Sequence, residues 1–324
     1  MNDLLIRRTV CDTPGYQSWP MIHSVGGRLV CAWSRGTAHD IRESVRHVRA
    51  AVSDDGGITW TGETTVVNTP GAADVAEGKG SDSAGAVLLW IRTWGNTVPA
   101  AQQLFRTEDG KTFERISRPA LDPMPMQITD IFPLPGGKLM CLWFAGFYRG
   151  DNHNSWGTLT SSDDGRTWTQ NVVEQELSQT DWPTEPSVFH AGNGRLFGIA
   201  RTEWGKAQFQ LQSEDCGVTW KRFRTNIGDI ALATPSLIFH PESRLIDHYY
   251  FQRGAGLLKK RTVSLNEIWN NPEAWPPPRI LAECSTAEHH AGNVNASRMN
   301  GKTVLAWYEG DPVNTAVFMA QDDL

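Results

Sequence analysis

Three arginines stand near the ends of apolar stretches, in AWSRG, GIAR and YYFQRG, and they are Arg35, Arg201 and Arg253. A guanidinium group is planar, keeps its charge at physiological pH and offers paired N–H donors that match the two oxygens of a carboxylate. Equivalent positions in a repeated unit would direct the three side chains toward one opening. The chemistry indicated is capture of a carboxylate, such as that of a sugar acid.

Groups that could act on a bound sugar acid lie elsewhere in the chain. Glu185 occurs in TEPSVF, beside apolar residues. Cleavage of a glycosidic bond builds positive charge at the anomeric carbon, which a carboxylate stabilises while an acid protonates the departing oxygen. Either His39, with an ordinary pKa near neutrality, or Asp40, with a pKa raised by burial, is expected to supply that proton.

A repeat indicates the elements that position these residues. Four copies of one turn recur, and they are SDDGGITW at 53–60, TEDGKTF at 107–113, SDDGRTW at 162–168 and SEDCGVTW at 213–220. In each copy the Asp accepts hydrogen bonds from the turn, the Gly takes a positive φ, and the aromatic residue packs between sheets. SLNEIW at 264–269 is a fainter copy without the glycine.

A second repeat precedes each turn. It is an apolar strand opened by a polar or small residue, and it occurs six times, from GGRLVCAWSRG to NGKTVLAWYEG. A period near 52 residues over the whole chain predicts an all-β fold, a six-bladed β-propeller with four-stranded antiparallel blades. We expect one domain over 1–324, with the N-terminal strand around 4–10 completing the last blade.

Composition narrows the function. The formal net charge of −6 provides no basic field for nucleic acid, and no apolar run is long enough for a signal peptide or a membrane span. Five widely spaced cysteines predict free thiols, which fit folding in a reducing cytoplasm. His289 and His290, adjacent on an expected strand, would point to opposite faces, so we expect no metal site and no cofactor.

The S-x-D-x-G-x-T-W turns resemble the Asp-boxes of the sialidase superfamily, over essentially the whole chain. That resemblance implies a glycosidase that holds a sialic-acid carboxylate with arginines. The family segment that bears the catalytic Glu and an arginine is similar to TEPSVFHAGNGRLFGIAR, which contains Glu185 and Arg201. The segment that bears another arginine is similar to YYFQRG, which contains Arg253. Two departures stand out. Gln17 replaces the first arginine, and Asn293 stands where a Tyr nucleophile is expected, in AGNVNASRMNGKTVLAWYEG.

These departures are similar to those of bacteriophage endosialidases, which lack the Tyr nucleophile and cleave polysialic acid internally. That resemblance implies catalytic roles for Tyr16 and His39 beside Glu185, favours His39 over Asp40 as the acid, and makes a virion-associated setting an alternative to the cytoplasm. Asp130 is expected to line the pocket together with the arginines, Gln17 and Asn293. The expected partner is an acidic oligo- or polysaccharide.

Three other functions stay open on the sequence. Loss of the Tyr nucleophile is also typical of a module that only binds acidic glycans. His and Tyr also serve as base and acid in propeller lyases that act on uronic acids. A purely structural scaffold would have no use for the arginines. The cluster RESVRHVR at 42–49 is either a subsite wall or an exposed charged strand.

Overall fold

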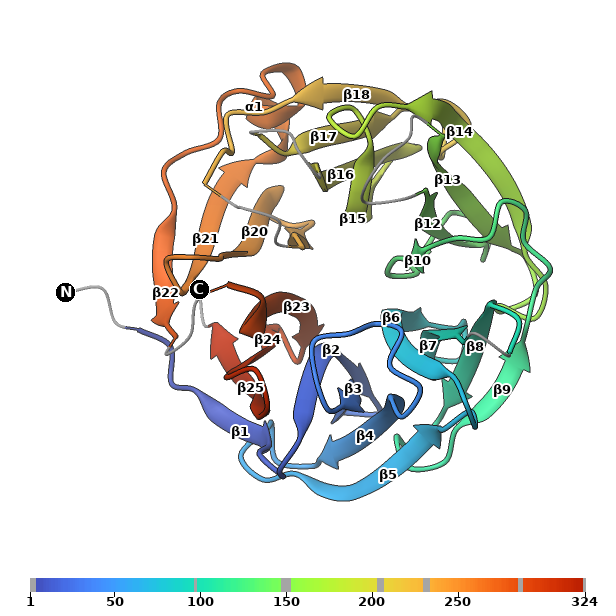
Figure 1. The fold of residues 1–324 in the computed structure, drawn as a ribbon. Coiled ribbons are helices and arrows are strands. Elements are labelled where there is room, and N and C mark those ends of the chain that lie inside the picture. Colours follow the sequence, from blue (N-terminus) through green and yellow to red (C-terminus); the bar gives the residue numbers. More distant parts are fainter. Residues whose placement is uncertain are drawn as a thin grey trace.

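A computed structural model describes residues 4–95, 98–146, 153–202, 207–229, 234–284 and 288–322. Within these ranges the chain forms six antiparallel sheets arranged as the blades of a ring (Figure 1). Four sheets are plain four-stranded meanders, the third has a divided inner strand, and the sixth takes its outer strand from the N-terminus. The predicted six-bladed propeller is therefore confirmed.

The first three blades run outward from the ring centre in chain order (Figure 1). Blade one contains β2 (Tyr16–Val25), β3 (Arg28–Gly36), β4 (His47–Ser53) and β5 (Thr61–Val67). Blade two contains β6 (Ala73–Ser81), β7 (Val87–Trp94), β8 (Ala101–Thr107) and β9 (Glu114–Ser117). Blade three contains β10 (Gln127–Ile128), β11 (Phe132–Pro133), β12 (Leu139–Ala145), β13 (Asn154–Ser161) and β14 (Thr169–Leu177).

The last three blades follow the same order, with one helix and one short 3₁₀ turn added. Blade four contains β15 (Pro183–Gly192), β16 (Arg195–Thr202), β17 (Phe209–Ser213) and β18 (Lys221–Arg224). Blade five contains β19 (Ser236–His240), β20 (Leu245–Gln252), β21 (Leu257–Ser264), α1 (Leu265–Asn270) and β22 (Arg279–Glu283). Blade six contains η1 (Glu288–His290), β23 (Ala291–Met299), β24 (Lys302–Gly310), β25 (Thr315–Asp322) and β1 (Arg8–Cys11).

The ring is closed by strands from opposite ends of the chain. β1 pairs antiparallel with β25, with Arg8 opposite Met319 and Thr9 opposite Phe318. Val10 and Cys11 pack into the same buried cluster as residues of blades one and six. The expected closure by the N-terminal strand is confirmed, because β1 pairs with β25 from Val317 to Met319.

The Asp-box turns are held by their own side chains. In blade four, the Asp215 carboxylate accepts from the Thr219 hydroxyl at 2.6 Å and from its N–H at 2.9 Å, while the Gly217 N–H donates to the Ser213 hydroxyl at 2.8 Å. In blade three the equivalent serine is Ser161, one residue before the Ser162 expected from the sequence, because its hydroxyl bonds Asp163 and Gly165.

The aromatic residue of each turn packs on the preceding blade. Trp168 lies 5.2 Å from Trp90, and Trp220 lies 5.7 Å from Trp156, measured between ring centroids. In blade five the faint copy forms helix α1 instead of a turn, because it lacks the glycine. Its Trp269 still reaches the preceding blade and lies 6.4 Å from Phe197.

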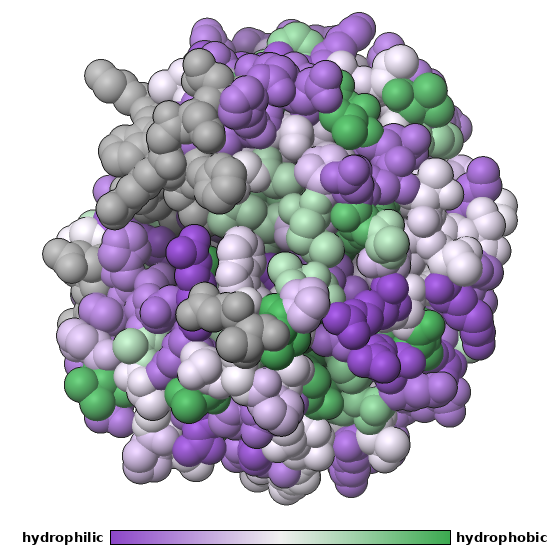
Figure 2. Space-filling view, turned by 45° about the vertical axis from the view of Figure 1, so that its right-hand side comes forward, coloured by the Kyte–Doolittle hydropathy of each residue, from purple (hydrophilic) through white to green (hydrophobic). Residues whose placement is uncertain are grey.

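The outer surface is mainly polar. On the face in Figure 2, hydrophobic residues form patches separated by hydrophilic ones. The five cysteines are free, and Cys11, Cys31 and Cys141 are buried. Among the described residues, no helix has the length and apolar character needed to cross a bilayer.

Candidate functional site at the ring centre

The inner strands of blades one, four and six carry the same β-bulge. In each, two residues of the inner strand oppose one residue of the next strand. The first of the two has a positive φ: 52° at Trp19, 48° at Glu185 and 49° at Asn293. Non-glycine residues rarely adopt this conformation, and such residues gather at functional sites. The bulges thus set the direction of Glu185 and Asn293.

Glu185 is buried against a cation and a hydroxyl. Its Oε1 lies 3.2 Å from Nη1 of Arg201, and its Oε2 accepts a hydrogen bond from Thr234. Arg201 is itself buried, and its Nε lies within 3.3 Å of the Thr184 hydroxyl. The carboxylate and the guanidinium are therefore held by neighbouring strands of blade four.

Arg253 lies against the bulge of blade six. Its Nη2 donates to Oδ1 of Asn293 at 3.0 Å, and its Nη1 lies 3.4 Å from Nδ1 of His289. Gly292 permits this contact, because a Cβ there would lie 3.2 Å from Nε of Arg253. The residue that replaces the expected Tyr nucleophile thus positions an arginine.

A narrow cavity lies where the inner strands converge. Its lining includes Glu185 and Asn293 at the bulges, Glu77 from blade two, Asp130 from blade three and Thr234 from blade five. The cavity has a volume of about 40 Å³, more than the roughly 10–15 Å³ that one water molecule needs.

Two carboxylates of this cavity have basic partners of their own. Glu77 lies 3.1 Å from Nε of Arg92 and accepts from the Ile128 N–H at 3.0 Å. Burial raises the pKa of Glu77 to about 7, although the charge of Arg92 opposes the shift. Asp130 accepts from Nζ of Lys79 at 2.6 Å. Sequence reasoning found Asp130 and missed Glu77, whose stretch lacks an Asp-box or family signature.

Tyr16 and His39 come together at the junction of blades one and six. The Tyr16 hydroxyl lies 3.1 Å from Nδ1 of His39 and 3.1 Å from Nδ1 of His290, and it donates to the His289 carbonyl at 3.3 Å. Burial and the nearby Arg253 charge lower the pKa of His39 to about 3. Burial raises the pKa of Tyr16. Both groups are therefore neutral near pH 7.

Tyr308 connects the two halves of the site. Tyr308 in β24 and Arg201 in β16 occupy equivalent positions. Each pairs with the residue just before the bulge of its inner strand, Gly292 for Tyr308 and Thr184 for Arg201. The Tyr308 hydroxyl donates to the His289 carbonyl at 2.8 Å. The charges of Arg253, Arg46 and Glu185 all act on its pKa, which burial raises. Tyr308 thus lies near both Glu185 and Arg253, whose charges act on it from different blades.

Three other predicted residues make different contacts. Arg35 donates to the Pro14 carbonyl and lies 3.9 Å from Glu63 of β5. The expectation that Arg35, Arg201 and Arg253 occupy equivalent positions is wrong. Ser34 in blade one and Tyr250 in blade five occupy the position of Arg201. A shift of one residue turns a side chain to the opposite face of a sheet.

Gln17 and Asp40 are engaged in local structure. The buried Gln17 amide accepts from Trp33 at 2.8 Å and donates to the Thr13 carbonyl at 3.1 Å. The exposed Asp40 accepts from the Arg42 N–H at 2.8 Å and so caps a turn. Neither contact belongs to the group around Glu185.

Arg46 belongs to the segment RESVRHVR at 42–49, which the sequence indicated to be a subsite wall or an exposed charged strand. Its side chain is fully buried, lies 4.7 Å from the Trp19 ring and donates to the Ser18 hydroxyl at 3.0 Å. It also donates to the Asp40 carbonyl at 2.9 Å. Arg46 therefore holds the segment that carries His39 against the inner strand of blade one.

The histidine pair also differs from expectation. His289 and His290 lie in the 3₁₀ turn η1, so the expected strand with opposite-facing side chains is wrong. Both approach His39, with ring centroids 5.5 and 6.5 Å away. Within the described part of the chain, no three His, Cys, Asp or Glu side chains form a group that could hold a metal ion.

The fold and this site define a sialidase-like β-propeller. The BNR repeat-like domain family matches residues 27–236, and the chain belongs to that family. No curated protein sequence matches the chain.

Solved structures match over nearly the whole chain. A Dyadobacter fermentans protein of unknown function has a TM-score of 0.79 at 15% identity, with 99% of each chain covered. The Hadza microbial sialidase Hz136 has a TM-score of 0.72 at 16% identity, covering 95% of this chain and 66% of its own. The phage phi92 endosialidase has a TM-score of 0.72 at 10% identity, covering 99% and 69%. At these identities the likeness shows the fold.

Proposed function

We propose that the chain is a glycoside hydrolase for an acidic glycan, with the substrate carboxylate bound between Arg201 and Arg253. One observation carries the proposal: Glu185, paired with Arg201, and Asn293, paired with Arg253, line the same central cavity. A guanidinium group suits a planar carboxylate that accepts paired hydrogen bonds, and the partners of both arginines line this cavity. We also propose that the enzyme cleaves bonds inside the glycan polymer, as an endosialidase does.

Glu185 is proposed as the catalytic carboxylate. Its negative charge stabilises the positive charge that develops at the anomeric carbon, and it accepts a proton from the attacking water. The water oxygen bonds to the anomeric carbon while the bond to the departing oxygen breaks. Arg201 holds Glu185 in position, because Nη1 of Arg201 lies 3.2 Å from Oε1 of Glu185.

The departing oxygen takes its proton at the Tyr16 and His39 pair. A His39 with a pKa of about 3 is neutral near pH 7, so the imidazolium expected from the sequence is not the donor. The Tyr16 hydroxyl supplies the O–H, turning from the His289 carbonyl toward the departing oxygen. Neutral His39 donates to the Tyr16 oxygen and stabilises the charge left there. The proton that Glu185 accepted then passes through water to the Tyr16 oxygen, so that both groups return to their starting states.

The test compares Glu185→Gln with wild type on α2,8-linked polysialic acid, with products separated by size. Removing the charge is expected to lower turnover at least about 100-fold, the order attributed to one such catalytic group. Binding of the polymer should stay within a few-fold. Glu174→Gln is the matched control, since Glu174 pairs with Arg222 on an outer strand. Turnover of Glu185→Gln within threefold of wild type would reject the role of Glu185.

A second candidate is β-elimination on a uronic acid, which the Tyr16 and His39 contact favours. A base would remove the hydrogen beside the carboxylate, and the glycosidic oxygen would leave with a proton as a C=C bond forms. Hyaluronan digestion followed by near-ultraviolet absorbance tests this candidate. Polymer binding without any product from wild type would instead identify a glycan-binding module.

A further inference from the structure

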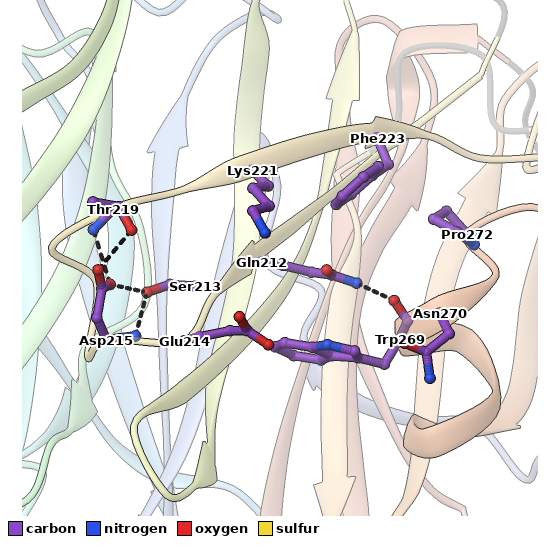
Figure 3. Close-up of a pocket in the computed structure, with 10 residues that line it drawn as sticks. All are labelled: Gln212, Ser213, Glu214, Asp215, Thr219, Lys221, Phe223, Trp269, Asn270 and Pro272. Atoms are coloured by element: carbon purple, nitrogen blue, oxygen red, sulfur yellow. Dashed lines mark hydrogen bonds between the residues drawn. The ribbon is translucent and has the colours of Figure 1, made fainter.

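A second pocket lies on the outer rim, where helix α1 of blade five meets blade four. It has a volume of about 490 Å³, within the roughly 300–1,000 Å³ typical of small-molecule sites. The Asp-box turn of blade four forms one wall, and the end of α1 forms the other (Figure 3). The pocket thus lies beside the segment 264–269, where the faint copy of the Asp-box forms helix α1 and no turn.

Two aromatic side chains from different blades line this pocket. Trp269 comes from α1 and Phe223 from the outermost strand β18. Both are partly exposed, so part of each ring is available to a ligand. The axial C–H groups of a pyranose carry slight positive charge and pack well on the negative face of an aromatic ring.

The indole is held in place by its neighbours. The Gln212 side-chain amide donates to the Trp269 carbonyl at 2.7 Å (Figure 3), and that of Gln210 donates to the Ile268 carbonyl at 2.9 Å. These bonds satisfy carbonyls that the end of a helix leaves open. The Arg195 guanidinium lies 4.9 Å from the Trp269 ring. A ligand would therefore meet a preformed surface.

The polar groups of the pocket suit hydroxyls. Lys221 and Glu214 both line it and are both exposed (Figure 3), and neither forms an ion pair among the described residues. An ammonium donor and a carboxylate acceptor together match the oxygens and hydrogens of a vicinal diol. An acidic sugar would face the Glu214 charge, and the neighbouring Asp215 would add to the repulsion.

From this lining we infer that the rim pocket binds a neutral pyranose unit of a glycan. The inference does not depend on catalysis at the ring centre. A glycan polymer that contains neutral units could bind the rim pocket and the central site at once. Contact at the rim would then raise the local concentration of the glycan at the ring centre.

The test is a titration by saturation-transfer NMR with three neutral probes, maltohexaose, lactose and chitotriose, and with α2,8-trisialic acid as the acidic probe. At least one neutral probe is expected to bind with a millimolar dissociation constant. Phe223→Ala should weaken that binding at least about tenfold and Lys221→Ala severalfold. Lys111→Ala, an exposed lysine on the Asp-box turn of blade two, is the matched control and should bind as wild type does.

Two further results decide the inference. Glu185→Gln should bind the neutral probe as wild type does, which separates the rim pocket from the central site. Failure of all neutral probes to bind, binding of trisialic acid alone, or neutral binding unaffected by both Phe223→Ala and Lys221→Ala would overturn it. Lys221 is exposed, so its substitution tests the pocket even if the Phe223 variant folds poorly.

Discussion

Asn293 combines backbone strain with a contact to Arg253. Its φ of 49° is one that a side chain rarely adopts, yet asparagine tolerates this region better than most residues. Its amide oxygen holds the Arg253 guanidinium at 3.0 Å. The residue therefore has two separable effects, one on stability and one on the candidate site.

Asn293→Gly should separate these effects. Glycine relieves the strain, so the free energy of unfolding is expected to stay equal or rise by up to about 1 kcal/mol. Loss of the acceptor for Arg253 should weaken binding of sialyllactose about tenfold. Denaturant unfolding and calorimetric titration measure the two. Asn300→Gly, at a φ of 50° in an exposed turn, is the control for strain alone. Unchanged sialyllactose affinity in Asn293→Gly would contradict the assigned contact.

At this scale the sequence predicted part of the site. The family resemblance identified Glu185, Arg201 and Arg253, because their stretches keep a recognisable motif. It did not identify Tyr308, which depends on the register set by the bulge in blade six. Glu77 was missed for a similar reason. No pattern in ADVAEGKGS signals that a carboxylate will be buried beside an arginine from the neighbouring strand.

Asp-box turns join the third and fourth strands of blades one to four. In blade three, the buried Ser161 hydroxyl donates to Asp163 at 2.8 Å and accepts from the Gly165 N–H at 2.9 Å. Adjacent Ser162 is exposed. The copy SDDGRTW expected from the sequence begins at Ser162, yet the buried serine that holds the turn is Ser161.

Ser161→Ala should lower the free energy of unfolding, because the Gly165 N–H loses its acceptor where water has little access. The expected loss is about 1–2 kcal/mol. Ser162→Ala should change it by less than about 0.5 kcal/mol. Urea denaturation of both variants measures the difference. Equal effects would mean that the turn is held in some other way.

The period and the apolar strands predicted the blades well, because each repeated strand became the second strand of a blade. The repeat did not predict the irregular elements of the blades. The divided inner strand of blade three, the helix α1 and the 3₁₀ turn η1 all depend on packing between blades. Local spacing carries no record of such contacts.

At the scale of the whole molecule, burial lowers the pKa of three histidines of the described part to about 3, and they are His23, His39 and His248. In the unfolded chain each would take up a proton near pH 6.5, whereas the folded protein keeps it neutral until about pH 3. The unfolded state therefore binds more protons in between. Stability is fully present above about pH 6.5 and falls as the pH drops toward 3.

His248→Phe isolates one of these contributions. The His248 ring stacks on Tyr250 with centroids 4.8 Å apart, and its nitrogens have no hydrogen-bond partner among the described residues, so phenylalanine keeps the main contact. At pH 5 the variant should exceed wild type in free energy of unfolding by about 2 kcal/mol, since each pKa unit corresponds to about 1.4 kcal/mol. The gain should shrink toward pH 7.5.

Urea unfolding from pH 4.5 to 7.5 measures this dependence. His153→Gln, at an exposed position, serves as the control for loss of a histidine. A constant difference between His248→Phe and wild type over the whole range would show that burial of His248 does not govern acid sensitivity.

The pairing of β1 with β25 has a consequence for biosynthesis. A ribosome releases β1 long before β25, so β1, the outer strand of blade six, has no partner until the other five blades have been synthesised. Contacts between such distant segments form slowly. A nascent chain would hold an unpaired β1 until β25 has left the ribosome, and chaperones that shield apolar edges would matter most before that moment.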